Sequence, residues 1–200
     1  RIVDIISDVN LCYSEHARRY LMECGLPKER TFVTGSPMAE VLHANLDKIE
    51  ASNVHQRLGL TKGQYILLSA HREENIDTDR NFVQLFTAVN AMAEKYDMPI
   101  LYSCHPRSRK RLEATGFQLD TRVIAHEPLG FLDYNCLQMN AFAVVSDSGT
   151  LPEESSFFLS VGKPFPAVSI RTSTERPEAL DAGCFVLAGI DAEPLLQAVE

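Results

Sequence analysis

The 200-residue sequence predicts an α/β protein built on a doubly wound, mainly parallel sheet. Short apolar runs alternate along the chain with longer helical stretches, and several of these runs contain no polar alternation. Continuous apolar runs are expected when helices cover both faces of a parallel sheet. Regular strand–helix alternation favours right-handed crossovers and a doubly wound topology. Because no repeat, low-complexity tract or long linker interrupts this pattern, we expect one domain over residues 1–200.

Seven short segments are the candidate strands. Each is rich in apolar or β-branched residues, and each is followed by polar, glycine or proline residues that end a strand. In chain order they are residues 9–13, 31–34, 65–69, 100–103, 122–125, 142–146 and 167–170.

Three of the intervening helices have recognisable boundaries or faces. Ser14 is a suitable N-cap for a helix that Gly25 ends. Ser36 followed by Pro37 is a favourable start for the next helix. Between residues 82 and 96 the apolar positions keep the 3.6-residue period of a helix with one buried face. Those positions are Phe82, Leu85, Phe86, Val89, Met92, Ala93 and Tyr96.

Composition excludes several classes of protein. The net charge is −8, with 27 acidic and 19 basic residues, so the chain lacks the basic surface of a non-specific nucleic-acid binder. Five scattered cysteines without a Cys-x-x-Cys pair argue against a disulfide framework and a zinc site. We expect them to be mostly core residues of a cytoplasmic protein. No apolar run approaches the ~20 residues of a membrane span, no signal peptide is recognisable, and both ends look like cuts in a longer protein.

Ligands of doubly wound sheets bind beyond the carboxyl ends of the strands, and four polar clusters follow candidate strands. The first is at residues 69–75. His71 is suited to contact a phosphate or to assist proton transfer, and Arg72 to pair with a phosphate or with a carboxylate of its own loop. A solvated loop with internal salt bridges is the alternative. The density of ionisable groups at a strand exit favours a functional role.

The second cluster is the basic run at residues 105–111. Pro106 suits the first turn of a helix, and the basic side chains make a local positive patch near its N-terminus. Arg109, Lys110 and Arg111 are consecutive and point in different directions, so several must face solvent. His105 is therefore the candidate site residue of this cluster.

The third cluster, at residues 146–154, is the most informative. A strand ends in the turn Ser148-Gly149-Thr150, which opens a helix whose free N–H groups and dipole favour a diphosphate. Glu154 lies about one helical turn further on, where a carboxylate can accept both hydroxyls of a ribose. The alternative is an ordinary N-capped helix with acidic residues in its first turn.

The fourth cluster and one aromatic complete the candidate site. Arg176 lies between Glu175 and Glu178 after the last strand, where it either binds a phosphate or ties loops together. Taken alone, the cluster slightly favours the structural role. An aromatic side chain after the turn at residues 128–130 either stacks on a base or belongs to the core. Together the clusters suggest a nucleotide diphosphate.

Five of these motifs occur in an order that resembles the non-hydrolysing UDP-N-acetylglucosamine 2-epimerases. They are His71-Arg72-Glu73, His105-Pro106, Asp147-Ser148-Gly149, Glu153-Glu154 and the Thr-Glu-Arg-Pro-Glu run at residues 174–178. The resemblance covers essentially the whole chain. It implies a GT-B-like architecture, with two Rossmann-type domains and an active site between them. This chain would be the second, UDP-binding domain, with the N-terminal domain absent.

The resemblance also implies roles for individual residues. Those that would bind UDP are Leu129 and Tyr134 at the uracil, Ser148, Gly149 and Thr150 at the diphosphate, Glu154 at the ribose, and Arg176 with His71 near the phosphates. Arg72 and His105 match positions that take part in a regulatory UDP-N-acetylglucosamine site in some relatives.

The family's reaction eliminates UDP across C1–C2 and adds it back with C2 inverted, without a nicotinamide cofactor. The protein must stabilise developing diphosphate charge and move the C2 proton. Because the family's acidic proton-transfer residues lie on the first domain, His71 is the one candidate catalytic residue here. The resemblance thus implies that this chain binds UDP or a UDP-N-acetylhexosamine without completing a cycle, and that the full-length protein is a homodimer.

Finer features resemble the branch that acts on 6-deoxy sugars. They include the Gly-Ser-Pro-Met-Ala-Glu-Val-Leu run at residues 35–42, although the Gly-Lys-Pro at residues 162–164 is typical of the generic family. That branch interconverts UDP-2-acetamido-2,6-dideoxy-L-talose and UDP-N-acetyl-L-fucosamine for capsule or O-antigen synthesis. Two other functions stay open, the donor domain of a GT-B glycosyltransferase and a non-enzymatic nucleotide sensor. The His-Arg-Glu and Thr-Glu-Arg-Pro-Glu motifs favour the epimerase.

Overall fold

The computed structural model describes residues 2–200, which form two compact units divided between Ala44 and Asn45. All seven candidate segments overlap a strand. The sequence predicts a single domain and a single sheet, but the first two strands pair only with each other and form a separate two-stranded sheet. Periodicity identifies a strand from its own residues, whereas the choice of partner depends on residues far away in the chain.

The first unit is a small parallel strand pair with helices. It contains α1 (Ile2–Ile6), β1 (Asn10–Cys12), α2 (Glu15–Glu23), the 3₁₀ turn η1 (Lys28–Arg30) and β2 (Thr31–Val33), and the register pairs Leu11 with Phe32. Ser14 caps α2 by accepting a hydrogen bond from the Ala17 N–H at 3.2 Å, as predicted. Helix α3 (Pro37–Glu50) starts after Ser36 and crosses the division between the units.

This first unit leaves much apolar surface uncovered. Burial among its described residues is confined to Cys12, Thr31 and Leu42. The large apolar side chains that stay exposed, by 43 to 77%, are Ile2, Val3, Ile5, Ile6, Val9, Leu11, Tyr13, Tyr20, Phe32, Val33 and Val41. A two-stranded sheet with so few buried side chains cannot supply a core of its own.

The second unit contains a six-stranded sheet in which every pair is parallel, in the order β5-β4-β3-β6-β7-β8. Its strands are β3 (Ile66–Ser69), β4 (Ile100–Ser103), β5 (Val123–His126), β6 (Ala143–Ser146), β7 (Ala167–Ser169) and β8 (Val186–Leu187). Strand β8 is not among the predicted strands, because its two residues are too few to show a pattern. The chain order reverses beside β3, which lies between β4 and β6. The predicted α/β, doubly wound parallel fold is confirmed.

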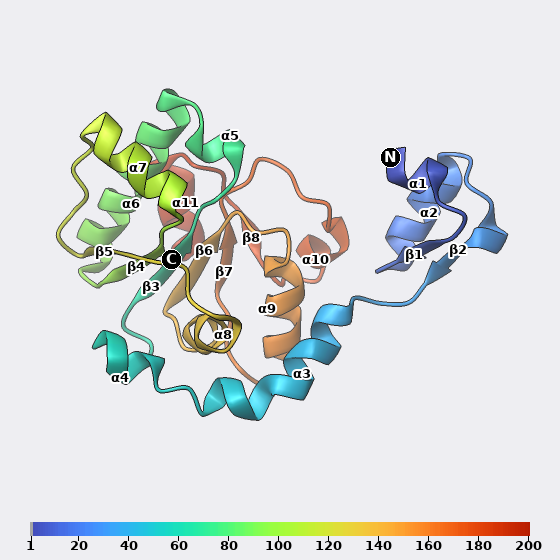
Figure 1. Ribbon diagram of the computed structural model, residues 1–200, viewed down its shortest axis with the longest axis horizontal. Coiled ribbons are helices and arrows are strands. Elements are labelled where there is room, and N and C mark those ends of the chain that lie inside the picture. The colour runs from blue at the N-terminus through green and yellow to red at the C-terminus, as the bar shows by residue number, and fades with distance from the viewer. Residues whose placement is uncertain (1) are drawn as a thin grey trace. The chain divides into compact units, whose positions relative to one another are not determined.

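Helices cover both faces of this sheet (Figure 1). The helices of this unit that follow α3 are α4 (Val54–Leu58), α5 (Glu73–Ile76), α6 (Asp79–Tyr96), α7 (Pro106–Thr115), α8 (Phe131–Met139), α9 (Leu151–Ser160), α10 (Pro177–Asp181) and α11 (Ala192–Val199). The residues of β3, β4 and β6 are all buried, which explains why their sequences are apolar without alternation. No helix within residues 2–200 has the length and apolar character that crossing a bilayer requires.

The core forms largely between the sheet and the predicted apolar face of α6. Phe82, Phe86 and Met92 of that face are completely buried, and Tyr96 packs at its end. The ring of Phe86 contacts those of Phe82 and Tyr102, with centroids 4.7 and 5.3 Å away. The prediction of a one-faced helix over this stretch is confirmed.

A buried histidine joins α4 to the sheet on the other side of the unit. The Tyr65 hydroxyl donates its only proton to the Leu137 carbonyl at 2.6 Å. The His55 Nε2, 3.0 Å from the same hydroxyl, must therefore donate to it. The His55 Nδ1 then faces the Cys136 thiol at 3.9 Å. This arrangement suits a neutral imidazole, and burial lowers the pKa of His55 below its ordinary value of 6.5.

His55 should make the protein less stable in mild acid. Because the folded-state pKa is lowered, the unfolded chain binds more protons, so this stabilisation is present above pH 6.5 and is lost as the pH falls towards the folded-state pKa. We expect the urea midpoint to fall less between about pH 7.5 and about pH 5.5 in His55→Gln than in the wild type. Equal falls in the two proteins would contradict this role.

Candidate functional site

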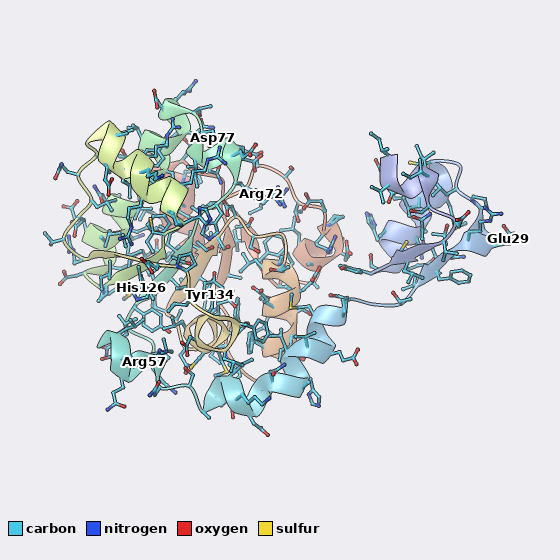
Figure 2. The ribbon with its side chains drawn as sticks, viewed as in Figure 1. Glu29, Arg57, Arg72, Asp77, His126 and Tyr134 are labelled. Atoms are coloured by element: carbon cyan, nitrogen blue, oxygen red, sulfur yellow. The ribbon has the colours of Figure 1, made fainter. Side chains whose placement is uncertain are left out.

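The predicted residues follow the carboxyl ends of strands in the six-stranded sheet, and the loops after β3 and β6 leave it at its switch point. Strands β3 and β6 are neighbours there, with Ser69 opposite Ser146. The ladder continues one step further, because the Asp147 N–H donates to the Ser69 carbonyl at 3.1 Å. Arg72 lies at this edge on the loop between β3 and α5, as Figure 2 shows. Doubly wound sheets bind their ligands at such a position.

The guanidinium of Arg72 lies over the turn that follows β6. Its Nε donates to the Asp147 carbonyl at 2.9 Å. A Cβ added at Gly149 would lie 3.6 Å from the Arg72 Nη2. Gly149 does not have a positive φ, so the backbone conformation does not require glycine there. Its missing side chain instead leaves space beside a positive charge, which suits the close approach of an anion.

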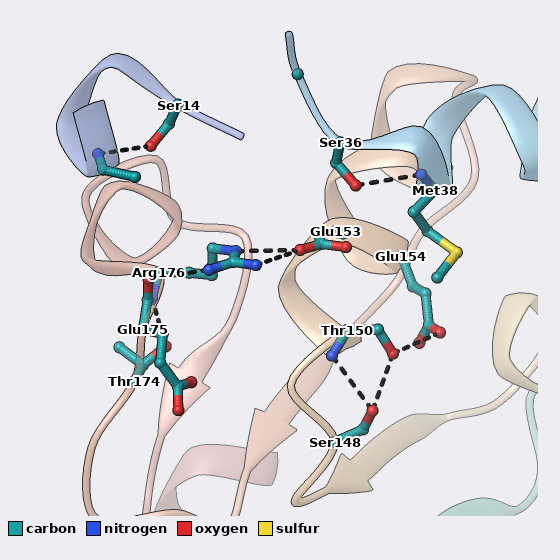
Figure 3. Close-up of polar contacts among 12 residues, drawn as sticks. Ser14, Ser36, Met38, Ser148, Thr150, Glu153, Glu154, Thr174, Glu175 and Arg176 are labelled. Atoms are coloured by element: carbon teal, nitrogen blue, oxygen red, sulfur yellow. Dashed lines mark hydrogen bonds and ion pairs between the residues drawn. The ribbon is translucent and has the colours of Figure 1, made fainter. Parts of the chain in front are cut away.

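The turn and Glu154 share one hydrogen-bonded chain (Figure 3). The Thr150 hydroxyl donates its proton to Glu154 Oε1 at 3.0 Å. The Ser148 hydroxyl, 2.9 Å from the Thr150 hydroxyl oxygen, therefore donates to that oxygen. The Ser148 oxygen also accepts from the Thr150 N–H at 3.3 Å. Thr150 is the N-cap residue of α9, but its side chain makes no capping hydrogen bond to the helix backbone.

Glu154 is almost completely buried, with 8% of its surface exposed. Its Oε2 accepts a hydrogen bond from Gln138 on α8 at 2.8 Å. Burial raises the pKa of Glu154, and the bonds from Gln138 and Thr150 oppose that rise. Each carboxylate oxygen has one protein donor and a further lone pair, so the group can accept two more hydrogen bonds from a ligand.

Tyr134 lies on α8 beside this carboxylate. It is half-buried, and burial raises its pKa to about 12 while a hydrogen bond with Ser69 opposes the rise. The charges of Glu154 and Asp147 contribute to the same increase. Leu129, on the turn before α8, is also half-buried. The structure therefore brings Tyr134, the aromatic residue predicted to contact the base, to the same edge of the sheet as Glu154, the residue predicted to bind the ribose.

Arg176 contacts a partner that the sequence did not indicate. Its Nε and Nη2 donate to Glu153 Oε1 at 3.0 and 2.9 Å, which joins the loop after β7 to the first turn of α9. Glu175 instead pairs with Arg171 through two hydrogen bonds of 2.5 and 2.7 Å, and Arg171 lowers its pKa to about 2. Arg171 lies two residues after β7 and directly after the strand segment predicted at residues 167–170, and this position in the sequence could have identified it.

His71 and His105 lie close together, with their ring centroids 6.3 Å apart. His71 is exposed as a whole residue, but desolvation of its ring lowers its pKa. The charge of Asp147 opposes this decrease, and His105 adds to it. His105 caps α7, because its Nδ1 accepts from the Arg107 N–H at 3.3 Å. Arg107, which belongs to the basic run at residues 105–111, forms an ion pair with Asp77 at 2.6 Å.

The fold is a doubly wound α/β domain with polar and charged groups gathered at its switch point, and this class includes the nucleotide-binding Rossmann domains. A family model described as UDP-N-acetylglucosamine 2-epimerase matches residues 1–200. The chain belongs to that family.

Known proteins of the same kind resemble the chain in sequence and in structure. It is 31% identical over 207 residues to UDP-N-acetylglucosamine 2-epimerase of Methanocaldococcus jannaschii, covering 100% of this chain and 55% of the relative. The structure of UDP-N-acetylglucosamine 2-epimerase from Rickettsia bellii is 43% identical, with a TM-score of 0.87 over 99% of this chain and 51% of the other. The M. jannaschii enzyme solved with UDP-GlcNAc and UDP gives a TM-score of 0.89 at 30% identity, over 99% and 55%. The chain thus spans about half the length of its relatives.

Proposed function

We propose that the carboxyl edge of the six-stranded sheet binds the UDP part of a UDP-N-acetylhexosamine. The observation that carries the proposal is the junction of a buried carboxylate, a hydroxyl-rich turn and an arginine at the switch point. Glu154 would hold the ribose, Ser148, Gly149 and Thr150 the diphosphate, and Tyr134 with Leu129 the uracil. The relative of known structure that was solved with UDP-GlcNAc and UDP supports this choice of ligand.

The basic residues of the site are assigned to the phosphates. Arg72 is held beside Gly149, where its charge would face a diphosphate. His71 would contact a phosphate or assist proton transfer, because its lowered pKa keeps it neutral near pH 7. Arg176 reaches the same region through Glu153. His105, next to His71, would contribute with Arg72 to a regulatory nucleotide-sugar site.

The full-length protein would be a 2-epimerase that eliminates UDP and adds it back with C2 inverted. The other acid–base groups would lie in a part of the protein that this chain does not contain, since the chain spans about half of its relatives. The exposed apolar side chains of residues 2–41 support contact with such a part. The isolated chain is therefore expected to bind UDP without epimerising a sugar. Detectable C2 inversion by the purified chain would contradict this.

Finer assignments follow from the resemblance of residues 35–42 to the 6-deoxy branch. The sugar would be UDP-2-acetamido-2,6-dideoxy-L-talose or UDP-N-acetyl-L-fucosamine, used for capsule or O-antigen synthesis by a cytoplasmic homodimer. Incubating the full-length protein with a 6-deoxy substrate and with UDP-GlcNAc, and identifying the products by NMR, would decide the sugar. Transfer of a sugar rather than epimerisation would instead indicate a glycosyltransferase, but the named relatives do not favour it.

Calorimetric titration of the 200-residue chain tests the proposed ligand. We expect UDP to bind at least about tenfold more tightly than UMP or ADP, because UMP lacks one phosphate and ADP carries a different base. Equal affinities for UDP and ADP would contradict uridine recognition. If no ligand binds to the chain but UDP binds to the full-length protein, the site needs the remaining part. If neither protein binds UDP, the proposed function is wrong.

A further inference from the structure

The carboxylate of Asp147 is the most heavily used acceptor at the switch point. Asp147 follows β6 and is 1% exposed. Both of its oxygens lie 3.0 Å from the His71 N–H. Its Oδ2 also accepts from the Arg72 N–H at 2.9 Å and from the Asn75 side chain at 3.0 Å. All three donors belong to the loop and helix that follow β3, the neighbouring strand.

The contacts run in both directions between the two strand exits. While the Asp147 side chain accepts from the backbone of Arg72, the Arg72 Nε donates to the Asp147 carbonyl. The main chain and the side chain of Arg72 are thus both fixed by one residue of the next strand. An ionised carboxylate is an acceptor only, which matches three converging N–H donors.

We propose that Asp147 is a positioning residue that holds Arg72 over the Ser148–Thr150 turn and fixes the backbone of His71 beside it, so that groups from the exits of two strands form one diphosphate site. This inference rests on the proposed function and assigns a role to a residue that does not touch the ligand. Asp147 lies next in the chain to Ser148, and it anchors the arginine that lies over Gly149. Moving the loop would separate the positive charge from the turn.

A purely structural role makes a different prediction from a positioning role. If Asp147 only stabilised the fold, its loss would affect all ligands of a folded protein equally or not at all. If it positions Arg72 and His71, its loss weakens the contacts to phosphates and spares those to the nucleoside. The ratio of UDP to uridine affinity therefore separates the two roles, because uridine has the same base and ribose without phosphates.

The test is the Asp147→Asn variant of the 200-residue chain, titrated with UDP and uridine by NMR. The amide keeps the shape of the side chain but turns one acceptor into a donor that faces N–H groups. We expect UDP affinity to fall about tenfold and uridine affinity to stay within about twofold of the wild type. Asp120→Asn is the matched control, because Asp120 pairs with Arg122 beside β5 and should leave both affinities unchanged.

Each outcome decides the inference. An unchanged UDP affinity, or equal losses for UDP and uridine, would overturn it while leaving the proposed function intact. If the wild-type chain binds neither ligand, the same variants are titrated in the full-length protein, and a lack of UDP binding there would overturn the proposed function and this inference with it. If Asp147→Asn does not fold, the second variant is Asn75→Ala, which removes only one of the three donors. It should lower the affinity for UDP about threefold and leave the affinity for uridine unchanged. Unchanged UDP binding by a folded Asn75→Ala would overturn the inference in that case.

Discussion

Replacing Glu154 with glutamine is expected to weaken UDP binding roughly a hundredfold while the chain stays folded. The proposed ribose contacts are two hydrogen bonds to a charged acceptor, each worth about 1.5 kcal/mol, and their sum corresponds to about two powers of ten in affinity. Glutamine keeps the size of the side chain but has one acceptor oxygen and no charge.

The surroundings of Glu154 should tolerate this substitution. The Thr150 hydroxyl, which donates to the carboxylate, can rotate and accept from the new amide instead. Burial already raises the pKa of Glu154, which means that the site disfavours the charged form and that a neutral side chain is not costly there. A loss of affinity would therefore report on the ligand contact and not on unfolding.

A comparison of UDP with 2′-deoxy-UDP makes the test specific for the ribose. The wild type should prefer UDP, and Glu154→Gln should lose most of that preference, because the missing hydroxyl and the missing carboxylate belong to the same interaction. Glu113→Gln, an exposed change of the same chemistry on α7, is the matched control and should leave both affinities unaltered. Undiminished discrimination by Glu154→Gln would show that Glu154 does not hold the ribose.

Truncating Phe86 to alanine is expected to lower the free energy of unfolding by about 3 to 5 kcal/mol. Phe86 is completely buried on α6 and contacts the rings of Phe82, Tyr102 and Phe117. Alanine would leave a cavity between the helix and the sheet, which these rigid rings cannot fill. A loss of this size is a large part of the roughly 5 to 15 kcal/mol that stabilises a typical domain.

Urea denaturation of the purified variants measures this effect. Val83→Ala is the control, because Val83 lies on the same helix with 44% of its surface exposed and should cost under about 1 kcal/mol. Phe86→Leu should fall between the two, since leucine fills part of the volume. A Phe86→Ala loss no larger than that of Val83→Ala would mean that this face of α6 does not form the core.

The site was predictable where its residues follow one another in the chain. The turn at residues 148–150, the carboxylate one helical turn later and the His-Arg pair at 71–72 all stand next to strands that the apolar pattern identifies. Parallel strands place their carboxyl ends at one edge, so the convergence of these loops follows from the strand assignment.

The contacts between loops were not predictable in the same way. Arg176 has carboxylates on either side in the sequence but pairs with Glu153, 23 positions earlier. Gln138 gave no signal on α8, and only the packing of α8 against α9 brings it to Glu154. The sequence showed Asp147 only as part of a motif, because its three donors come from the loop and helix that follow the neighbouring strand β3.

The order of residues specified the strands and helices of this protein and the chemistry at the strand exits, because periodicity, capping and motif spacing are local properties. Tertiary structure alone decided which strands became neighbours. It placed β1 and β2 in a sheet of their own and β3 beside β6 at the switch point. The physical reason is that pairing and burial depend on contacts between distant parts of the chain, where hydrogen-bond partners and packing volumes must match simultaneously.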